Sequence, residues 1–462
     1  MIYLSDLPLD LLSRIAYFLP ISDLLNLSET SRTFHNLLFV IRFSNKISFS
    51  RIVPLSYFDS FTNVQYSTPR LRLPKHIQHL HWTSSKPIRF DIPETVTHLY
   101  FTRKFNHVLP RLPESLTYLE FGAYYNRILP KLPDTLTHLL LGSYYDRILP
   151  KLPDSLLHLA LSNDYNHPLT QLPGSLTCLK LGYHYHCPLP QLPDTLECLI
   201  LSYHFNHALS QLPDSLIHLE LGGVYDQPLP KLPSTLTYLK LGTCFNQLLP
   251  TLSDGLTHLI LSYWYNHPLP TLPLRLTCLK LGFYYDNPIP QLPNTLTELE
   301  LNHQCTYLPP EFPDSLTHLE LDTNDMISED IILPDSLTHL KLGGRYDSLL
   351  PQLPNSLKFL VLNALYNLPL PSLPDSLTHL IFGRKYNQIL PALPSYLVYL
   401  KLSHDYDQPL PTLPESLEHL ILGFKYSYHL TQLPASLRKL GVRKTHQVPR
   451  DISSDVVVVY PI

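Results

Sequence analysis

Apolar and polar residues follow a pattern that returns every twenty residues through most of the chain. One copy, residues 132–151, reads LPDTLTHLLLGSYYDRILPK. Its leucines are spaced Leu136-x-x-Leu139-x-Leu141, and apolar residues two apart predict a short strand with one buried face. Because each strand returns to the same edge one coil later, the strands are predicted to pair in parallel.

A column of prolines sets the number of copies. These prolines stand at the second residue of each copy, and Ser253 replaces proline in one copy. One inserted residue shifts the register of the column after Pro313. Eighteen copies follow from it, and a degenerate copy at Pro74 makes nineteen. A fixed period near twenty is typical of a solenoid, in which no unit buries its apolar face alone. We therefore predict a parallel β-sheet array of about 19 units of 20 residues.

The rest of each repeat predicts extended backbone and stacked side chains. Two prolines three apart, such as Pro150 and Pro153, exclude a helix there. An aromatic residue followed by Asn or Asp recurs after the strand, as in Tyr125–Asn126 and Tyr145–Asp146. We expect the rings to form a packed spine and the side-chain oxygens to accept hydrogen bonds from turn N–H groups.

The full phrase LPxSLTHLxLGxxYNxPLP resembles the FNIP repeat, and its LxxLxLG part matches the first half of a leucine-rich repeat. The FNIP family is a short leucine-rich variant found in social amoebae and in giant viruses of amoebae. The resemblance covers about four-fifths of the chain. It implies a leucine-rich-repeat-like solenoid. The giant-virus branch of the family suggests a viral protein that acts on host proteins, and a protein of an amoeba is the alternative.

Residues 1–42 stand outside the repeat. Leu11, Ile15, Phe18 and Leu19 share one helical face, and two further short helices are predicted before residue 42. Periodicity alone favours a helical cap on the solenoid. The sequence motif, from Leu7–Pro8 through FLP and DLL to SRTF, resembles an F-box. Asp10 stands where that family commonly has Glu.

The F-box resemblance implies a partner. F-box proteins dock on the Skp-type adaptor of a cullin–RING ubiquitin ligase. The residues that would supply the apolar docking surface are Leu7, Pro8, Leu11, Leu12, Ile15, Leu19 and Leu24.

The remaining boundaries follow from the decay of the repeat. We assign residues 43–92 to a linker and N-terminal cap repeats, with Val64 and Tyr66 in an irregular first strand. Residues 93–444 form the solenoid; residues 302–333 depart most from the repeat, and 326–331 form a longer acidic loop within them. Residues 445–462 form a C-terminal cap or tail, in which 456–460 is predicted to add a last covering strand.

Composition and the lack of certain sequence signals argue against several classes of function. The net charge of −4 gives no basic field for nucleic acid. No signal peptide or membrane-length apolar run is evident, and the six cysteines lack the CxxC spacing of a zinc module. These features predict a protein of a reducing compartment, the cytoplasm, which would be the host's if the protein is viral.

No constellation predicts catalysis or a cofactor. Outward His and Cys residues, such as His138, His158 and Cys178, are ligand types that zinc prefers, but neighbouring strands would set them in a line about 4.8 Å apart. Glu220 is expected to face Lys240, and Lys280 to face Glu300. A parallel β-helix enzyme acting on polysaccharide would need a carboxylate cluster, which the sequence does not show. We predict neither metal, cofactor nor enzymatic activity.

The two residues after the strand-end glycine or serine vary between repeats, which a binding function requires. Large aromatic residues gather there between positions 183 and 284. Exposed Tyr and Trp often dominate binding energy. The predicted target-binding residues are Tyr183, Tyr203, Tyr263, Trp264, Phe283 and Tyr284. The alternative is that these rings only cover the aromatic spine beneath them.

Together these features predict a substrate-recruiting F-box subunit of a cullin–RING ubiquitin ligase whose solenoid binds the target protein. An alternative is a non-enzymatic decoy or scaffold that sequesters the ligase adaptor.

Overall fold

The computed structural model describes residues 36, 38, 41–67, 72–301, 307–322, 332–344, 346, 348–362, 364–430, 432–443 and 456–459. It divides into two compact units, residues 1–207 and 208–462. The seven residues expected to dock on the adaptor lie outside the described residues.

The described part of the N-terminal region packs against the first regular coil. Strand β1 (Ile47–Ser48) leads into the short helix α4 (Phe49–Ile52), and η2 (Phe58–Ser60) precedes strand β2 (Asn63–Tyr66). Strand β1 pairs in parallel with β2, and the Phe49 ring meets the Tyr66 ring edge-on at 4.4 Å. The irregular first strand predicted at Val64 and Tyr66 is confirmed. This segment covers the open edge that β2 would otherwise expose.

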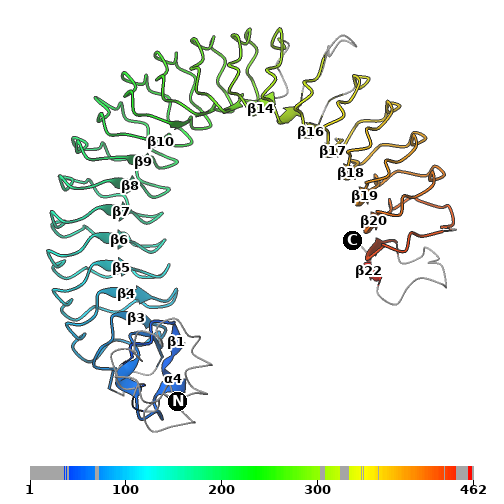
Figure 1. Ribbon diagram of the computed structural model, residues 1–462. Coiled ribbons are helices and arrows are strands. Elements are labelled where there is room, and N and C mark those ends of the chain that lie inside the picture. The colour runs from blue at the N-terminus through cyan, green and yellow to red at the C-terminus, as the bar shows by residue number, and fades with distance from the viewer. Residues whose placement is uncertain are drawn as a thin grey trace, which may run out of the picture. The chain divides into compact units, whose positions relative to one another are not determined.

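Each regular coil contributes one short strand to a parallel sheet. In the first unit these strands are β3 (His79–Trp82), β4 (His98–Phe101), β5 (Tyr118–Glu120), β6 (His138–Leu140), β7 (His158–Ala160), β8 (Cys178–Lys180) and β9 (Cys198–Ile200). In the second unit they are β10 (His218–Glu220), β11 (Tyr238–Lys240), β12 (His258–Ile260), β13 (Cys278–Lys280), β14 (Glu298–Leu301), β15 (His318–Leu321), β16 (His339–Leu342), β17 (Phe359–Val361), β18 (His379–Ile381), β19 (Tyr399–Lys401), β20 (His419–Ile421), β21 (Lys439–Gly441) and β22 (Val457–Val459). Figure 1 follows the coils through each unit.

The register of the sheet is one coil per strand throughout each unit. Leu139 of β6 pairs with Leu159 of β7, and Leu239 of β11 pairs with Leu259 of β12. Strand β22 pairs in parallel with β21, so the predicted covering strand at the C-terminal end is confirmed. The predicted solenoid of about 19 parallel turns is confirmed as well.

The leucine columns and the aromatic column form the core. Leu136 and Leu139 are fully buried, and so are spine rings such as Tyr145. Tyr125 and Tyr145 lie parallel with 6.1 Å between ring centroids, and Tyr225 and Phe245 do the same at 6.2 Å. Both separations fall within the roughly 4.5–7 Å between centroids that is typical of favourable aromatic pairs.

Polar side chains satisfy the backbone between coils. Asn106 Oδ1 accepts a hydrogen bond from the Asn126 N–H at 3.0 Å, and Asn126 Oδ1 accepts one from the Asp146 N–H at 3.2 Å. The expected ladder of side-chain oxygens on turn N–H groups is confirmed. A second ladder was not expected: Thr137 Oγ1 donates to the Thr117 carbonyl at 2.9 Å. The Thr117 carbonyl also accepts the backbone N–H groups of Thr137 and His138 at 2.9 Å, so the hydroxyl adds to the backbone pairing at this position.

The proline-rich segment closes each coil without a helix. The Leu136 N–H donates to the Pro133 carbonyl at 3.1 Å, so the column proline opens a tight turn just before the strand. The remaining backbone is extended, as the paired prolines predict.

Close contact between coils makes a strand-end glycine sensitive to substitution. A Cβ at Gly242 would lie 1.6 Å from the Gly222 carbonyl oxygen. Serine fills this column elsewhere, and Ser262 Oγ donates to the Phe245 carbonyl at 2.5 Å. We expect Gly242→Ala to lower the free energy of unfolding by about 1–3 kcal/mol, as overpacking does. Gly242→Ser should cost less stability, because its hydroxyl can donate a hydrogen bond to a carbonyl of the preceding coil, as that of Ser262 does.

Urea unfolding of the unaltered chain, Gly242→Ala and Gly242→Ser measures these differences in stability. The control is Gly174→Ala, where an added Cβ meets nothing within 4 Å. Equal stability of the two alanine variants would show that the coils separate easily.

Candidate target-binding rim

The rim is defined here as the two residues that follow the strand-end glycine or serine of each coil. The second rim residue donates its N–H to the carbonyl of the first rim residue one coil earlier. Tyr144 donates to Ala123 at 2.9 Å, and Asp164 donates to Ser143 at 3.0 Å. The backbone thus holds rim side chains in register from coil to coil, which favours stacking of neighbouring rings.

Two of the six predicted target-binding residues lie in the first unit. Tyr183 and Tyr203 are stacked with ring centroids 4.8 Å apart and an interplanar angle of 11°. They are 44% and 38% exposed. The stacked pair therefore exposes part of each ring on the rim.

The other four lie in the second unit and form a double stack. Tyr263 stacks on Phe283 at 4.8 Å, and Trp264 stacks on Tyr284 at 4.3 Å. Tyr263 and Trp264 are 42% and 46% exposed, whereas the spine ring Tyr265 between coils is fully buried. Phe283 and Tyr284 are half-buried, and target binding at these four residues stays a prediction.

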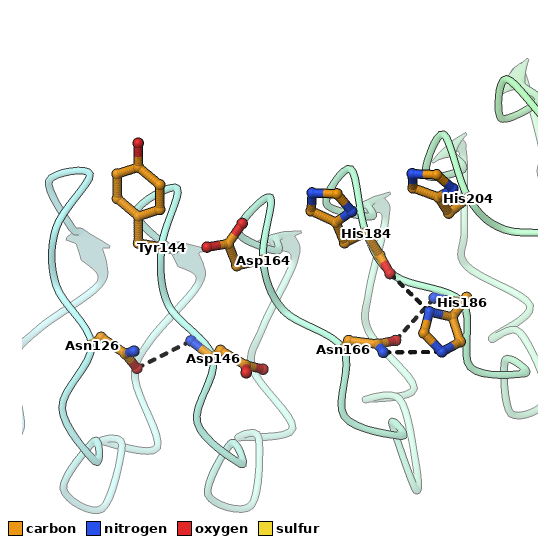
Figure 2. Close-up of a pocket in the computed structure, with 8 residues that line it drawn as sticks. All are labelled: Asn126, Tyr144, Asp146, Asp164, Asn166, His184, His186 and His204. Carbon is orange, nitrogen blue, oxygen red and sulfur yellow. Dashed lines mark hydrogen bonds between the residues drawn. The ribbon is translucent and has the colours of Figure 1, made fainter.

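An open hollow in the first unit adds residues that the sequence did not single out. Its volume is about 660 Å³. Figure 2 shows its two rows, one on the rim and one on the side-chain oxygen ladder. The lining residues are Asn126, Tyr144, Asp146, Asp164, Asn166, His184, His186 and His204. Tyr124 and Tyr144 belong to the same rim column, but they precede the aromatic cluster that the sequence predicts between positions 183 and 284.

Family models and solved structures match the chain. The model of the FNIP repeat matches residues 85–124, 105–144, 165–204, 205–244, 308–345, 329–364, 346–385, 366–405 and 386–425, together more than half of the sequence. The chain belongs to the FNIP-repeat family. The model of the F-box domain matches residues 4–43 of this FNIP-repeat chain.

Two solved structures are similar to this FNIP-repeat protein. CroV588, described as a novel circular LRR protein, is 31% identical with a TM-score of 0.61, over 87% of this chain and 72% of that one. YopM from Yersinia enterocolitica WA-314 is 24% identical with a TM-score of 0.58, over 81% of this chain and 89% of that one. The second likeness concerns the fold alone. No curated protein matches in sequence.

An F-box joined to a leucine-rich-repeat-like solenoid fits the role of a protein-interaction adaptor. Such architectures are typical of adaptors without enzymatic activity. Among the described residues, no helix is long and apolar enough to cross a membrane.

Charged residues on the sheet face of the FNIP array pair across strands. Lys240 lies 3.2 Å from Glu220, and Lys280 lies 2.6 Å from Glu298 and 3.7 Å from Glu300. The two predicted cross-strand pairs are confirmed. Burial and the charge of Glu320 raise the pKa of the Glu300 carboxyl. Partly exposed pairs of this kind contribute little stability each, about 0–1 kcal/mol.

Imidazole and aromatic rings form a line along the same face. His318 stacks on His339 at 4.0 Å, and His339 stacks on Phe359 at 4.3 Å. Within the described stretches, no group of three or more His, Cys, Asp or Glu residues could hold a metal ion. The line of rings expected from the strand spacing is therefore present, with neighbouring imidazoles in contact.

Half-buried imidazoles on the sheet face, in this line and beside it, predict that acid destabilises the protein. Burial, then the charges of His318, Lys358 and His379, lower the pKa of His339, and burial with Lys46 and the imidazoles of His79 and His98 lowers that of His81 to about 4. An unfolded chain takes up protons at His near pH 6.5, about two units above the pKa of His81 in the folded chain. The unfolded state thus binds more protons between pH 6.5 and 4, and stability falls as the pH drops through that window.

Melting curves at pH 7 and pH 5 test this expectation. The Tm should be lower at pH 5, and His339→Gln should reduce the difference. An unchanged Tm across this range would contradict it.

Proposed function

We propose that the chain is the substrate-recruiting F-box subunit of a cullin–RING ubiquitin ligase. Residues 4–43 would engage a Skp-type adaptor, and the solenoid rim would bind the target protein. The observation that carries the proposal is the F-box match in a chain whose solenoid exposes stacked aromatic rims. Ubiquitin transfer would be carried out by the partners, so the chain needs no active site or cofactor of its own.

The build of the coils supports a recruiting role. Backbone bonds, the aromatic spine and the two side-chain ladders join each coil to the next within a unit. These contacts fix the spacing of neighbouring coils, and we infer that a target bound across several coils is held in one orientation. Orientation matters for a ligase because the target lysine must reach the ubiquitin-carrying partner. We place this activity in the cytoplasm.

The double stack of the second unit supplies the test of target binding. Tyr and Trp bury much area with few rotors to freeze, which favours them at binding surfaces. We expect Trp264→Ala with Tyr284→Ala to weaken target capture by at least about 2 kcal/mol, roughly thirtyfold. The measurement is the quantity of each cellular protein retained by immobilised full-length chain.

The matched control changes two rim residues of another coil. Arg384 and Lys385 occupy the equivalent positions, and replacing both with alanine should change capture little. Equal capture by the aromatic variant and the unaltered chain would place the target site elsewhere.

A further inference from the structure

Two aromatic rim residues, Tyr124 and Phe424, each lie under a guanidinium group of a neighbouring coil. The Arg103 guanidinium lies over the Tyr124 ring, 5.5 Å from its centroid, in the first unit. The Arg443 guanidinium lies over the Phe424 ring at 4.2 Å in the second unit. A cation over an aromatic face is attracted by the ring quadrupole. At two places, therefore, the chain itself covers an exposed aromatic rim ring with a guanidinium group.

The stack that begins at Arg103 has a second end. Tyr124 stacks on Tyr144 at 5.2 Å with an interplanar angle of 21°. Arg103 lies over Tyr124, and Tyr144 lines the hollow of the first unit. The next rim residue is Asp164, which is too short to cover a ring, and Figure 2 shows its carboxylate beside Tyr144. The Tyr144 ring is 45% exposed.

The charges around the hollow favour a cation. Asp146 and Asp164 line it, whereas no Lys or Arg does. One oxygen of Asp146 lies 3.1 Å from His167 Nε2. Among the described residues, the Asp164 carboxylate makes no hydrogen bond or ion pair. A carboxylate that faces solvent next to an aromatic ring can bind a guanidinium through two parallel hydrogen bonds while the ring takes its face.

The far wall of the hollow limits the size of the group that enters. His184 and His204 stack on each other at 5.2 Å and lie beyond Asp164 along the rim. Asn166 Oδ1 is occupied because it accepts a hydrogen bond from the His186 N–H at 3.1 Å. Within the hollow, the rim thus contains a notch one coil wide, between Tyr144 of the tyrosine stack and His184 of the imidazole stack, with the Asp164 carboxylate in the middle.

We propose that this notch binds an arginine side chain of the target protein. The guanidinium lies on the exposed face of Tyr144 and pairs with Asp164, and it occupies at one end of the tyrosine stack the place that Arg103 holds at the other. Lysine fits less well because its ammonium is a compact, strongly hydrated charge without the planar fork. This assignment rests on the proposed function, since it names the class of residue that the target presents.

The test is a binding measurement with the full chain. The probes are blocked seven-residue Gly/Ser peptides with arginine, lysine or citrulline at the centre, titrated by ligand-observed NMR at 150 mM salt. Citrulline keeps the shape of arginine and removes its charge. We expect the arginine peptide to bind at least tenfold more tightly than the citrulline peptide and several-fold more tightly than the lysine peptide.

Variants of the chain locate the binding. Asp164→Asn should weaken the arginine peptide at least tenfold, and Tyr144→Leu about fivefold, whereas Tyr144→Phe should keep its affinity because the ring remains. The matched control is Asp194→Asn, which removes the same charge from the exposed turn before strand β9. It should bind the arginine peptide as the unaltered chain does.

Three results would overturn the assignment: equal binding of arginine and citrulline peptides, unchanged binding by Asp164→Asn, or an equal loss in Asp194→Asn, which would indicate attraction by overall charge. Failure of this inference is separable from failure of the proposed function. Target capture without arginine binding rejects the notch alone, whereas arginine binding without any adaptor binding rejects the ligase role.

Discussion

Replacing Tyr225 with alanine is expected to destabilise the solenoid by about 3–5 kcal/mol, the range for large-to-small aromatic changes in cores. The Tyr225 ring is fully buried and lies parallel to Phe245 at 6.2 Å. Its loss would leave a cavity between two coils whose backbones are already joined. Those coils cannot close the gap without breaking hydrogen bonds in the sheet.

The damage should remain local because each coil contacts mainly its neighbours. In such an array, stability is close to a sum of unit and nearest-neighbour contributions. Hydrogen exchange should lose protection in the coils next to Tyr225, while coils beyond residue 340 keep theirs. The control is Tyr396→Ala, at a tyrosine 67% exposed, which should change stability by no more than about 0.5 kcal/mol. Uniform loss of protection to residue 443 would show that the unit melts as one.

Changing Leu7 and Pro8 to alanine together with Ile15→Asp is expected to abolish adaptor binding. These residues belong to the segment that matches the F-box model. Docking surfaces of this kind depend on apolar contacts, and a charge placed among them must be desolvated without a partner, which costs several kcal/mol. Co-purification of a Skp-type adaptor with the full chain measures the effect.

A milder variant guards against simple unfolding of the N-terminal segment. Leu7→Ala with Pro8→Ala, without the change at Ile15, should weaken the adaptor partly, and the melting curve of the solenoid should be unaltered in both variants. Undiminished adaptor binding by the triple variant would remove the F-box assignment.

The sequence predicted the repeated part of the fold well because every position is sampled many times. Leu139, Tyr145 and Asn126 each belong to a column, so the column reveals a buried strand, a spine or a ladder even where one copy deviates. The Thr137 ladder escaped notice because threonine two residues before a strand leucine also suits a solvent-facing strand position. Its hydroxyl is committed only once the coil spacing is known.

Unrepeated features were harder to predict, for the same reason. Strand β1 and helix α4 occur once, and their short apolar runs have no partner column that would fix their period. The notch at Tyr144 and Asp164 depends on which side chains stand side by side on successive coils. A pattern taken over all copies does not contain such differences between copies, so the hollow could be identified only from the structure.

The most direct measurement of the central claim is the ubiquitination of captured proteins in cells. Cells would express the full chain, the Leu7/Pro8/Ile15 variant or the Trp264/Tyr284 variant, and proteins retained by the chain would be analysed for ubiquitin. The account predicts that the full chain and the F-box variant retain the same proteins, and that these proteins carry ubiquitin only in cells with the full chain. The rim variant should neither retain these proteins nor cause their ubiquitination. Adaptor bound to the full chain with no protein whose ubiquitination depends on it would contradict substrate recruitment and indicate a decoy instead.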